Sequence, residues 1–196
     1  MLSLHLEGRE EFGWYERRHV ARGTVPVSPE AVFEFVDDPG NLTGHMSGRS
    51  ASMGGGRMVL AEDAWKGRKI GSRLALTGSA FGMRLRVETI VTEHEPPMRK
   101  AWKTIGEPRL IVIGSYRMFV DLTRLPGDGL ARPMTGLVVG IDYDLPRARI
   151  ARLIARVLSG WYARWCTTRM LRDTIRHFTV IAPPPAALAP EPPVAV

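Results

Sequence analysis

Carboxylates, a histidine and a tyrosine are the side chains of this sequence that could transfer a proton. The candidates for an acid–base pair are Glu62, Asp63, Glu88, His94 and Tyr116. Glu62 has the same parity as Met58 and Leu60 on an expected strand, so it could face an apolar space. A carboxylate there would have a raised pKa, which suits proton transfer. The spacing shows no partner, so Tyr116 and Glu62 are candidate catalytic residues. The alternative is that Glu62 is solvated near the mouth of a cavity.

Other catalytic chemistries lack their usual residue spacing. The histidines are His5, His19, His45, His94 and His177. No two of them have the close helical spacing of a zinc or iron site. Cys166 lies on an expected helix, where a lone cysteine is usually a small packing residue. We therefore predict no metal and no other cofactor.

Aromatic and methionine side chains form a second group, which could bind a ligand. The set expected between sheet and last helix is Trp102, Thr104, Tyr116, Met118, Trp161 and Trp165. Trp and Tyr supply apolar area with one hydrogen-bonding tip, and Met adapts to irregular shapes. Two interpretations stay open, because these side chains could fill a core or line a cavity.

The elements that position these side chains begin with a strand and a capped helix. Ser28 has the character of an N-cap, and Pro29 suits the first helical position. Asp37 and Asp38 end this helix, and Asp38 can cap a second short helix. The residues of the second helix expected at the rim of a cavity are Leu42, His45 and Met46.

From Ser50 to Tyr143 apolar and polar residues alternate, which is typical of an antiparallel sheet with one apolar face. The alternation is clearest over 83–95, where Leu85 and Val87 face the apolar side and are further candidates for ligand contact. The stretch "GEPR", residues 106–109, indicates a turn between two strands.

A long helix is expected from Pro146 to about Phe178. Its predicted buried stripe consists of Ile150, Ile154, Val157, Leu158, Trp161, Trp165, Leu171 and Ile175. A curved antiparallel sheet wrapped around this helix would bury the apolar face of the sheet and the stripe together, which predicts an α+β fold.

The same helix is rich in arginine. They are Arg147, Arg149, Arg152, Arg156, Arg164, Arg169, Arg172 and Arg176, against a single acid, Asp173. Arg149, Arg152 and Arg156 share one side. That side is either a solvated outer face or a transient contact with an anionic membrane surface. The helix has no recognised DNA-binding motif, so we expect no nucleic-acid partner.

Length and composition fit one globular domain. The chain has 196 residues, 44% hydrophobic and 24% charged, with a net charge of +7. One cysteine, no secretory signal and no apolar run of about 18 residues favour a cytoplasmic location. We expect an N-terminal lead-in over 1–13, a domain over 14–180 and a disordered Pro/Ala tail over 181–196.

Three stretches resemble the START-like, or SRPBCC, superfamily, in its polyketide cyclase/dehydrase and lipid-transport branch. They are "VPVSPEAVFEFVDDPGNLTGHM" after the first strand, "GRKIGS" before a strand pair, and "GWYARWCTTRM" in the last helix. The first-helix pattern of the family is matched by Pro29, Val32, Phe33, Asp38 and Pro39. The resemblance covers roughly residues 15–178. It implies a helix-grip fold, with about seven strands curved around the long helix and two short helices after the first strand.

For function, the resemblance implies a cavity between sheet and helix that binds a small hydrophobic or amphipathic ligand. The ligand would be a lipid, a polyketide or an aromatic molecule, and the protein a carrier or sensor. One alternative is a polyketide cyclase/dehydratase-like enzyme that holds a flexible substrate folded. A second alternative is an interaction module like the chaperone activators, since one fold hosts many functions.

Overall fold

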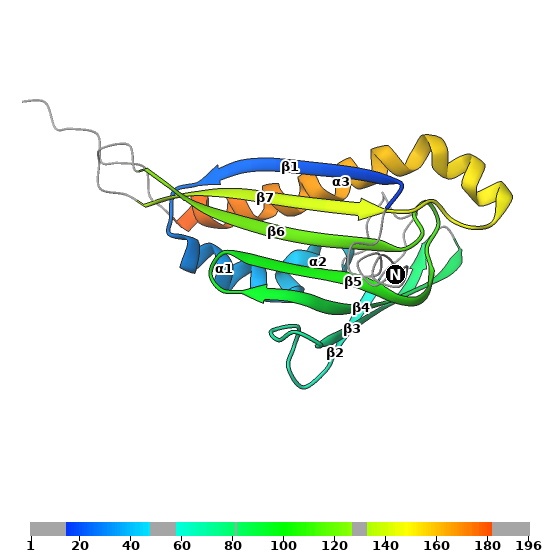
Figure 1. Cartoon of the computed structure of the whole chain (residues 1–196), viewed down its shortest axis with the longest axis horizontal. Helices are drawn as coiled ribbons and strands as arrows, with labels where there is room; N and C mark the ends of the chain where they lie inside the picture. Colours follow the sequence, from blue (N-terminus) through cyan, green and yellow to red (C-terminus); the bar gives the residue numbers. More distant parts are fainter. Residues whose placement is uncertain (1–14, 48–57, 81, 127–132, 182–196) are drawn as a thin grey trace, which may run out of the picture.

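A long helix crosses a curved antiparallel sheet in the computed structural model, which describes residues 15–47, 58–80, 82–126 and 133–181 (Figure 1). The side chains of 44–47, 80, 180 and 181 are outside this description. The elements are β1 (Arg17–Val25), α1 (Pro29–Asp37), α2 (Pro39–Ser47), β2 (Met58–Glu62), β3 (Arg73–Ala80), β4 (Met83–Glu95), β5 (Arg99–Arg109), β6 (Tyr116–Leu125), β7 (Met134–Tyr143) and α3 (Arg149–Ile181).

The described strands form one seven-stranded sheet in the order β1-β7-β6-β5-β4-β3-β2. Every neighbouring pair is antiparallel. The long helix α3 lies along β1 and β7, and α1 and α2 lie on the same side of the sheet (Figure 1). The predicted helix-grip α+β fold is therefore confirmed. Its core lies between the inner face of the sheet and the three helices.

The capping signals of the first helices act as predicted. The Ser28 side chain accepts a hydrogen bond from the Ala31 backbone N at 3.5 Å, at the N-terminus of α1. Asp38 ends α1, and its Oδ1 accepts a hydrogen bond from Gly40 N at 2.8 Å, at the start of α2. Asp37 is the last residue of α1, as predicted, and its buried side chain also pairs with Lys100.

The strand alternation is confirmed on β3 and β4. Leu74, Leu76, Val87, Thr89 and Val91 are buried, and the residues that alternate with them are more exposed. The predicted turn at 106–109 is wrong, because β5 continues through it to Arg109. Gly106 has φ +66° and the register with β4 shifts there, so the extra residues form an irregularity within β5 rather than a turn.

The first half of α3 is not buried as predicted. The buried residues there are Ala155, Ser159 and Ala163, spaced four apart on one face. The large apolar residues Ile150, Ile154, Val157, Leu158 and Trp161 are exposed instead. Small side chains let the helix approach the sheet closely, so the bulky ones point away. Leu171 of the second half is buried, and Ile175 packs against the core as expected.

The two predicted terminal segments, 1–13 and 181–196, lie outside the described residues except for Ile181, which ends α3. No helix within the described ranges has the length and apolar character needed to cross a membrane.

Candidate functional site: a cavity between sheet and long helix

An apolar cavity lies between the inner face of the sheet and α3, with a volume of about 50 Å³. Its lining consists of Met58, Leu76, Leu85, Val87, Leu110, Ile113, Tyr116, Met118, Ile141, Tyr162 and Cys166. Pockets that hold drug-sized ligands usually measure roughly 300–1,000 Å³. In this state the cavity is therefore too small for a lipid or polyketide, and such a ligand would have to displace lining side chains.

The sheet builds most of the wall because inward-facing positions of several strands meet there. Met118 of β6 is paired directly with Ile141 of β7. On the other side, Leu76 of β3 is paired with Val87 of β4. Cross-strand neighbours on one face bring their side chains together, so each pair contributes an apolar patch to the lining.

Three polar groups face this apolar surface. Tyr162 and Cys166 come from α3, four residues apart on one side of the helix, and Tyr116 comes from the start of β6. Burial raises the pKa of Cys166 to about 12, and it also raises the pKa of both tyrosines well above their ordinary value. All three groups are therefore protonated at neutral pH and can donate hydrogen bonds, but they are poor bases.

Four of the predicted ligand-contact residues line the cavity, namely Leu85, Val87, Tyr116 and Met118. Thr104 has a different position, because its hydroxyl lies 3.0 Å from the Tyr116 backbone N, from which it accepts a hydrogen bond. Thr104 therefore holds the strand end that carries Tyr116.

Other predicted contact residues pack nearby without lining the cavity. Trp102 and Trp165 are partly buried against the hydrophobic core, and Leu42 is buried within it. The centroid of the Trp165 ring lies 6.0 Å from that of the Tyr162 ring, so Trp165 packs beside a residue of the α3 wall. The side chains of His45 and Met46, predicted at the rim, lie outside the described residues.

The position predicted for Trp161 is wrong, and Glu62 has the solvated position that was its alternative. Trp161 is 61% exposed and faces away from the sheet, because the small residues of α3 occupy the buried side at this level. Glu62 is exposed at the end of β2 and does not line the cavity. Its strand parity with buried Met58 is correct, but it lies four residues further along, beyond the covered part of the sheet.

Sequence reasoning missed seven lining residues: Met58, Leu76, Leu110, Ile113, Ile141, Tyr162 and Cys166. Strand alternation could have found Met58, Leu76 and Ile141, since each has the inward parity of its strand. Leu110 and Ile113 lie in the connection between β5 and β6, where strand alternation gives no signal. Tyr162 and Cys166 can be predicted only if the rotation of α3 about its own axis is known. The large apolar residues of α3 indicate a different rotation from the one in the structure.

A buried charged cluster lies under α1, away from this cavity. Lys100 is 2% exposed, and its Nζ donates to Asp37 Oδ1 and to the Asp37 carbonyl O, each at 2.7 Å. His94 Nε2 lies 3.0 Å from Asp37 Oδ1. Desolvation lowers the pKa of Lys100, against the opposing effect of Asp37. The cluster connects α1 to β4 and β5, so His94 has a structural position rather than a catalytic one.

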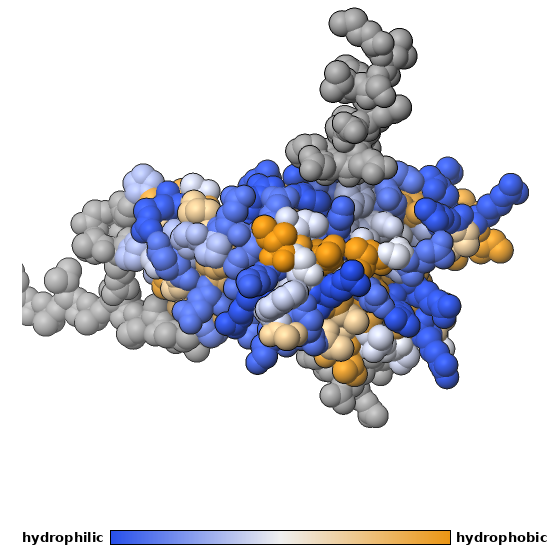
Figure 2. Space-filling view, turned by 60° about the horizontal axis from the view of Figure 1, so that its bottom comes forward, coloured by the Kyte–Doolittle hydropathy of each residue, from blue (hydrophilic) through white to orange (hydrophobic). Residues whose placement is uncertain are grey.

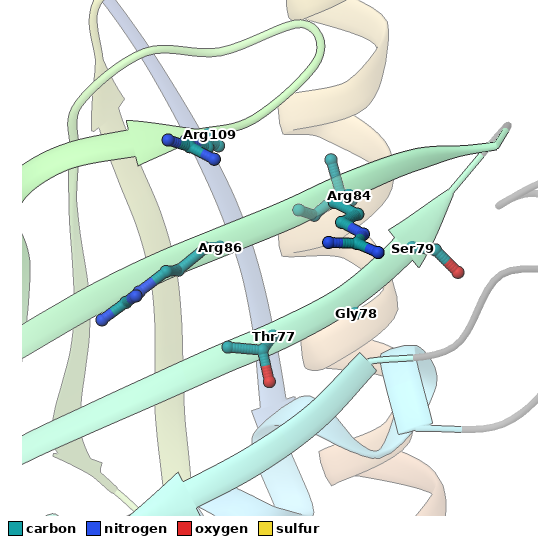
Figure 3. A pocket seen from close by; sticks show the side chains of 7 residues that line it. Thr77, Gly78, Ser79, Arg84, Arg86 and Arg109 are labelled. Atoms are coloured by element: carbon teal, nitrogen blue, oxygen red, sulfur yellow. The ribbon is translucent and has the colours of Figure 1, made fainter.

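A second, open hollow of about 430 Å³ lies on the outer face of the β3–β4 hairpin (Figure 3). Its polar lining comes from Thr77, Ser79, Arg84, Arg86 and Arg109. The arginines of β4 alternate with cavity-lining Leu85, so they point away from the inner cavity. Arg86 pairs with Glu88, and the remaining positive charge could attract anions. Among the described residues, no three His, Cys, Asp or Glu side chains are grouped to hold a metal ion.

Several solved structures share this architecture. The aromatase/cyclase Zhui from Streptomyces sp. R1128 has a TM-score of 0.59 at 13% identity, over 83% of this chain and 93% of that chain. TTHA0849 from Thermus thermophilus has a TM-score of 0.57 at 15% identity, over 85% and 100%. Norcoclaurine synthase from Thalictrum flavum has a TM-score of 0.55 at 11% identity, over 84% and 86%.

These likenesses support the helix-grip fold and concern the fold alone, because the identities are low. No protein-family model matches the chain, and no curated protein matches it.

Proposed function

We propose that this protein binds a small hydrophobic or amphipathic molecule between the sheet and α3, as a carrier or sensor in the cytoplasm. The observation that carries the proposal is the apolar cavity, whose polar groups, within the described residues, are two hydroxyls and a thiol that stay protonated. Such a lining can hold an apolar body and donate one or two hydrogen bonds to a polar end. None of these groups would readily remove a proton near neutral pH.

Binding requires the cavity to widen, since it now measures about 50 Å³. Methionine side chains lend themselves to this because they change shape at low cost. Met58 and Met118 both belong to the lining. We therefore expect the ligand to bind a conformation with a wider cavity. Because only a small fraction of the protein has that conformation before binding, the apparent affinity is reduced by the same fraction.

An enzyme of the cyclase/dehydratase type is the second candidate. The observation in its favour is that Tyr116 lines the cavity, where its hydroxyl could orient a substrate carbonyl. Glu62 is exposed and outside the cavity, so a proton transfer from Tyr116 to this carboxylate would need a rearrangement. The carrier function needs no such step, and we favour it for that reason.

A carrier must take up its ligand from another compartment or surface. The positively charged arginines of α3 suit contact with an anionic membrane, from which the ligand would be taken. Arg149 and Arg156 are exposed and make no ion pair with any described residue. Arg152 pairs with Glu16 at 2.9 Å in an exposed ion pair, which solvent and headgroups can replace. We propose a transient contact through these three residues.

The experiment that tests ligand binding is native mass spectrometry of the freshly purified protein. We expect a bound apolar species in the wild type and its loss in Cys166→Phe, which fills the cavity from α3. Thr168→Phe is the matched control, because Thr168 is two residues further on the same helix and does not line the cavity. Absence of bound species in the wild type, together with no uptake of added fatty acid, would contradict the proposal.

A further inference from the structure

The first half of α3 carries large apolar side chains that the fold leaves in solvent. The exposed fractions are 80% for Ile150, 67% for Leu153, 50% for Ile154, 78% for Val157, 43% for Leu158 and 61% for Trp161. Exposed apolar residues scattered singly are ordinary, but six on one short segment are not. We call these six residues the apolar face of α3.

The spacing of the apolar face is that of one side of a helix, because its members recur at steps of three and four. It is distinct from the side that packs on the sheet, which consists of Ala155, Ser159 and Ala163. Arg17 fixes this packing, since its Nη1 donates to the Arg156 carbonyl O at 3.0 Å and to Ser159 Oγ at 3.1 Å. The helix is therefore held on β1 with its apolar face outward.

The position of this segment makes the face accessible. In Figure 1 the first turns of α3 extend beyond the ends of the strands. At the same end of the molecule, Figure 2 shows hydrophobic atoms beside strongly hydrophilic ones. A Cβ added at Gly160 would meet nothing within 4 Å, so the surface remains open where the helix approaches the body of the protein.

The charges beside the face are positive. Arg147, Arg149, Arg152 and Arg156 precede or alternate with its residues, and no acidic residue occurs on α3 before Asp173. A second copy of this chain would bring two such arginine rows together without carboxylates of α3 to pair them. An anionic lipid surface offers both an apolar layer and negative headgroups, which matches the face and its border.

We propose that the apolar face of α3 inserts into the headgroup–acyl boundary of an anionic membrane while the neighbouring arginines contact the headgroups. This inference rests on the membrane contact proposed above and adds the residues that enter the lipid. Trp161 is followed directly by Tyr162, which lines the cavity, so docking brings the α3 wall of the cavity to the membrane. A ligand could then pass between lipid and cavity over a short path.

The experiment measures co-sedimentation of the full chain with vesicles of phosphatidylcholine containing about 30% phosphatidylglycerol. We expect binding to these vesicles and little binding to pure phosphatidylcholine. Leu153→Ser/Val157→Ser should weaken partitioning about tenfold or more, since two apolar side chains no longer enter the lipid. The matched control is Val59→Ser/Ile70→Ser, which removes side chains of similar exposure, 55% and 63%, outside α3. The control should bind like the wild type.

A second pair of variants separates insertion from charge attraction. Arg149→Gln/Arg156→Gln should weaken binding and reduce its salt dependence, while Arg22→Gln/Arg73→Gln, on strands, should change it less. If the arginine pair matters but Leu153→Ser/Val157→Ser binds normally, the electrostatic contact stands and insertion is wrong. If the wild-type protein does not bind these vesicles, the electrostatic contact and the insertion are both wrong. Ligand binding in the cavity is tested separately by mass spectrometry. A dimer that the serine variant converts to monomer would show a self-association face and overturn the inference.

Discussion

At the scale of single residues, the three polar groups of the cavity decide what chemistry it can support. Tyr116 and Cys166 are buried and Tyr162 is partly buried among apolar side chains, and desolvation opposes ionisation of each. Because the thiolate is the nucleophilic form of cysteine, a thiol that burial keeps protonated is not activated as a nucleophile. Near neutral pH these groups therefore offer hydrogen-bond donors to a ligand but neither a base nor an activated nucleophile.

The raised pKa of Cys166 predicts how stability depends on pH. The folded thiol keeps its proton until about pH 12, whereas the unfolded thiol loses it near 9.0. Above pH 9.0 the unfolded state therefore binds fewer protons, and the free energy of unfolding falls as pH rises. Urea unfolding at pH 8, 9 and 10 should show a shallower decline for Cys166→Ala than for the wild type. Parallel declines would show that the thiol ionises equally in both states.

The Asp37–Lys100 pair predicts a large loss of stability when it is broken. Asp37→Ala leaves the Lys100 ammonium buried without its partner, which typically costs about 3–5 kcal/mol. Glu107→Ala is the control, since its ion pair with Arg147 is exposed on both sides and should contribute less than about 1 kcal/mol. Equal losses in urea unfolding would contradict the buried role of the cluster.

At the scale of elements, two glycines should respond in opposite ways to a methyl group. Gly140 of β7 lies under the Phe119 ring, and an added Cβ would approach Phe119 Cζ to 2.1 Å. Gly140→Ala should therefore destabilise the protein by about 1–3 kcal/mol. Gly160→Ala, with nothing within 4 Å of its Cβ, should stabilise α3 by up to about 1 kcal/mol. Thermal unfolding measures both, and the same sign for both changes would contradict the packing described for β7 and α3.

The elements also show what the sequence could and could not predict. Capping by Ser28 and Asp38 and the alternation on β3 and β4 are local signals, and the structure follows them. The stretch 106–109 has turn residues, but pairing with β4 keeps it in β5. On α3, periodicity identifies an apolar side without showing what covers it. The small residues pack on the sheet instead, so Trp161 lies in solvent and Tyr162 faces the cavity.

At the scale of the whole molecule, one helix contributes to both the cavity and the membrane-facing surface that we propose. The α3 residues that line the cavity directly follow the apolar face of α3. The second half of α3 packs into the core through Cys166, Met170 and Phe178, while the first turns of the helix extend beyond the ends of the strands (Figure 1). Seven lining residues escaped prediction because the cavity joins strands, a connection and a helix whose mutual placement no local pattern encodes. The resemblance to a fold family located the cavity, and packing then determined its lining.

Methyl NMR of the protein titrated with a fatty acid tests the central claim most directly. We predict that chemical-shift changes concentrate on the cavity methyls of Leu76, Val87, Ile113 and Ile141. The core methyls of Leu122 and Leu137, which do not line the cavity, should change little. Saturating changes confined to the apolar face of α3, or no changes at all, would contradict a ligand site between the sheet and the long helix.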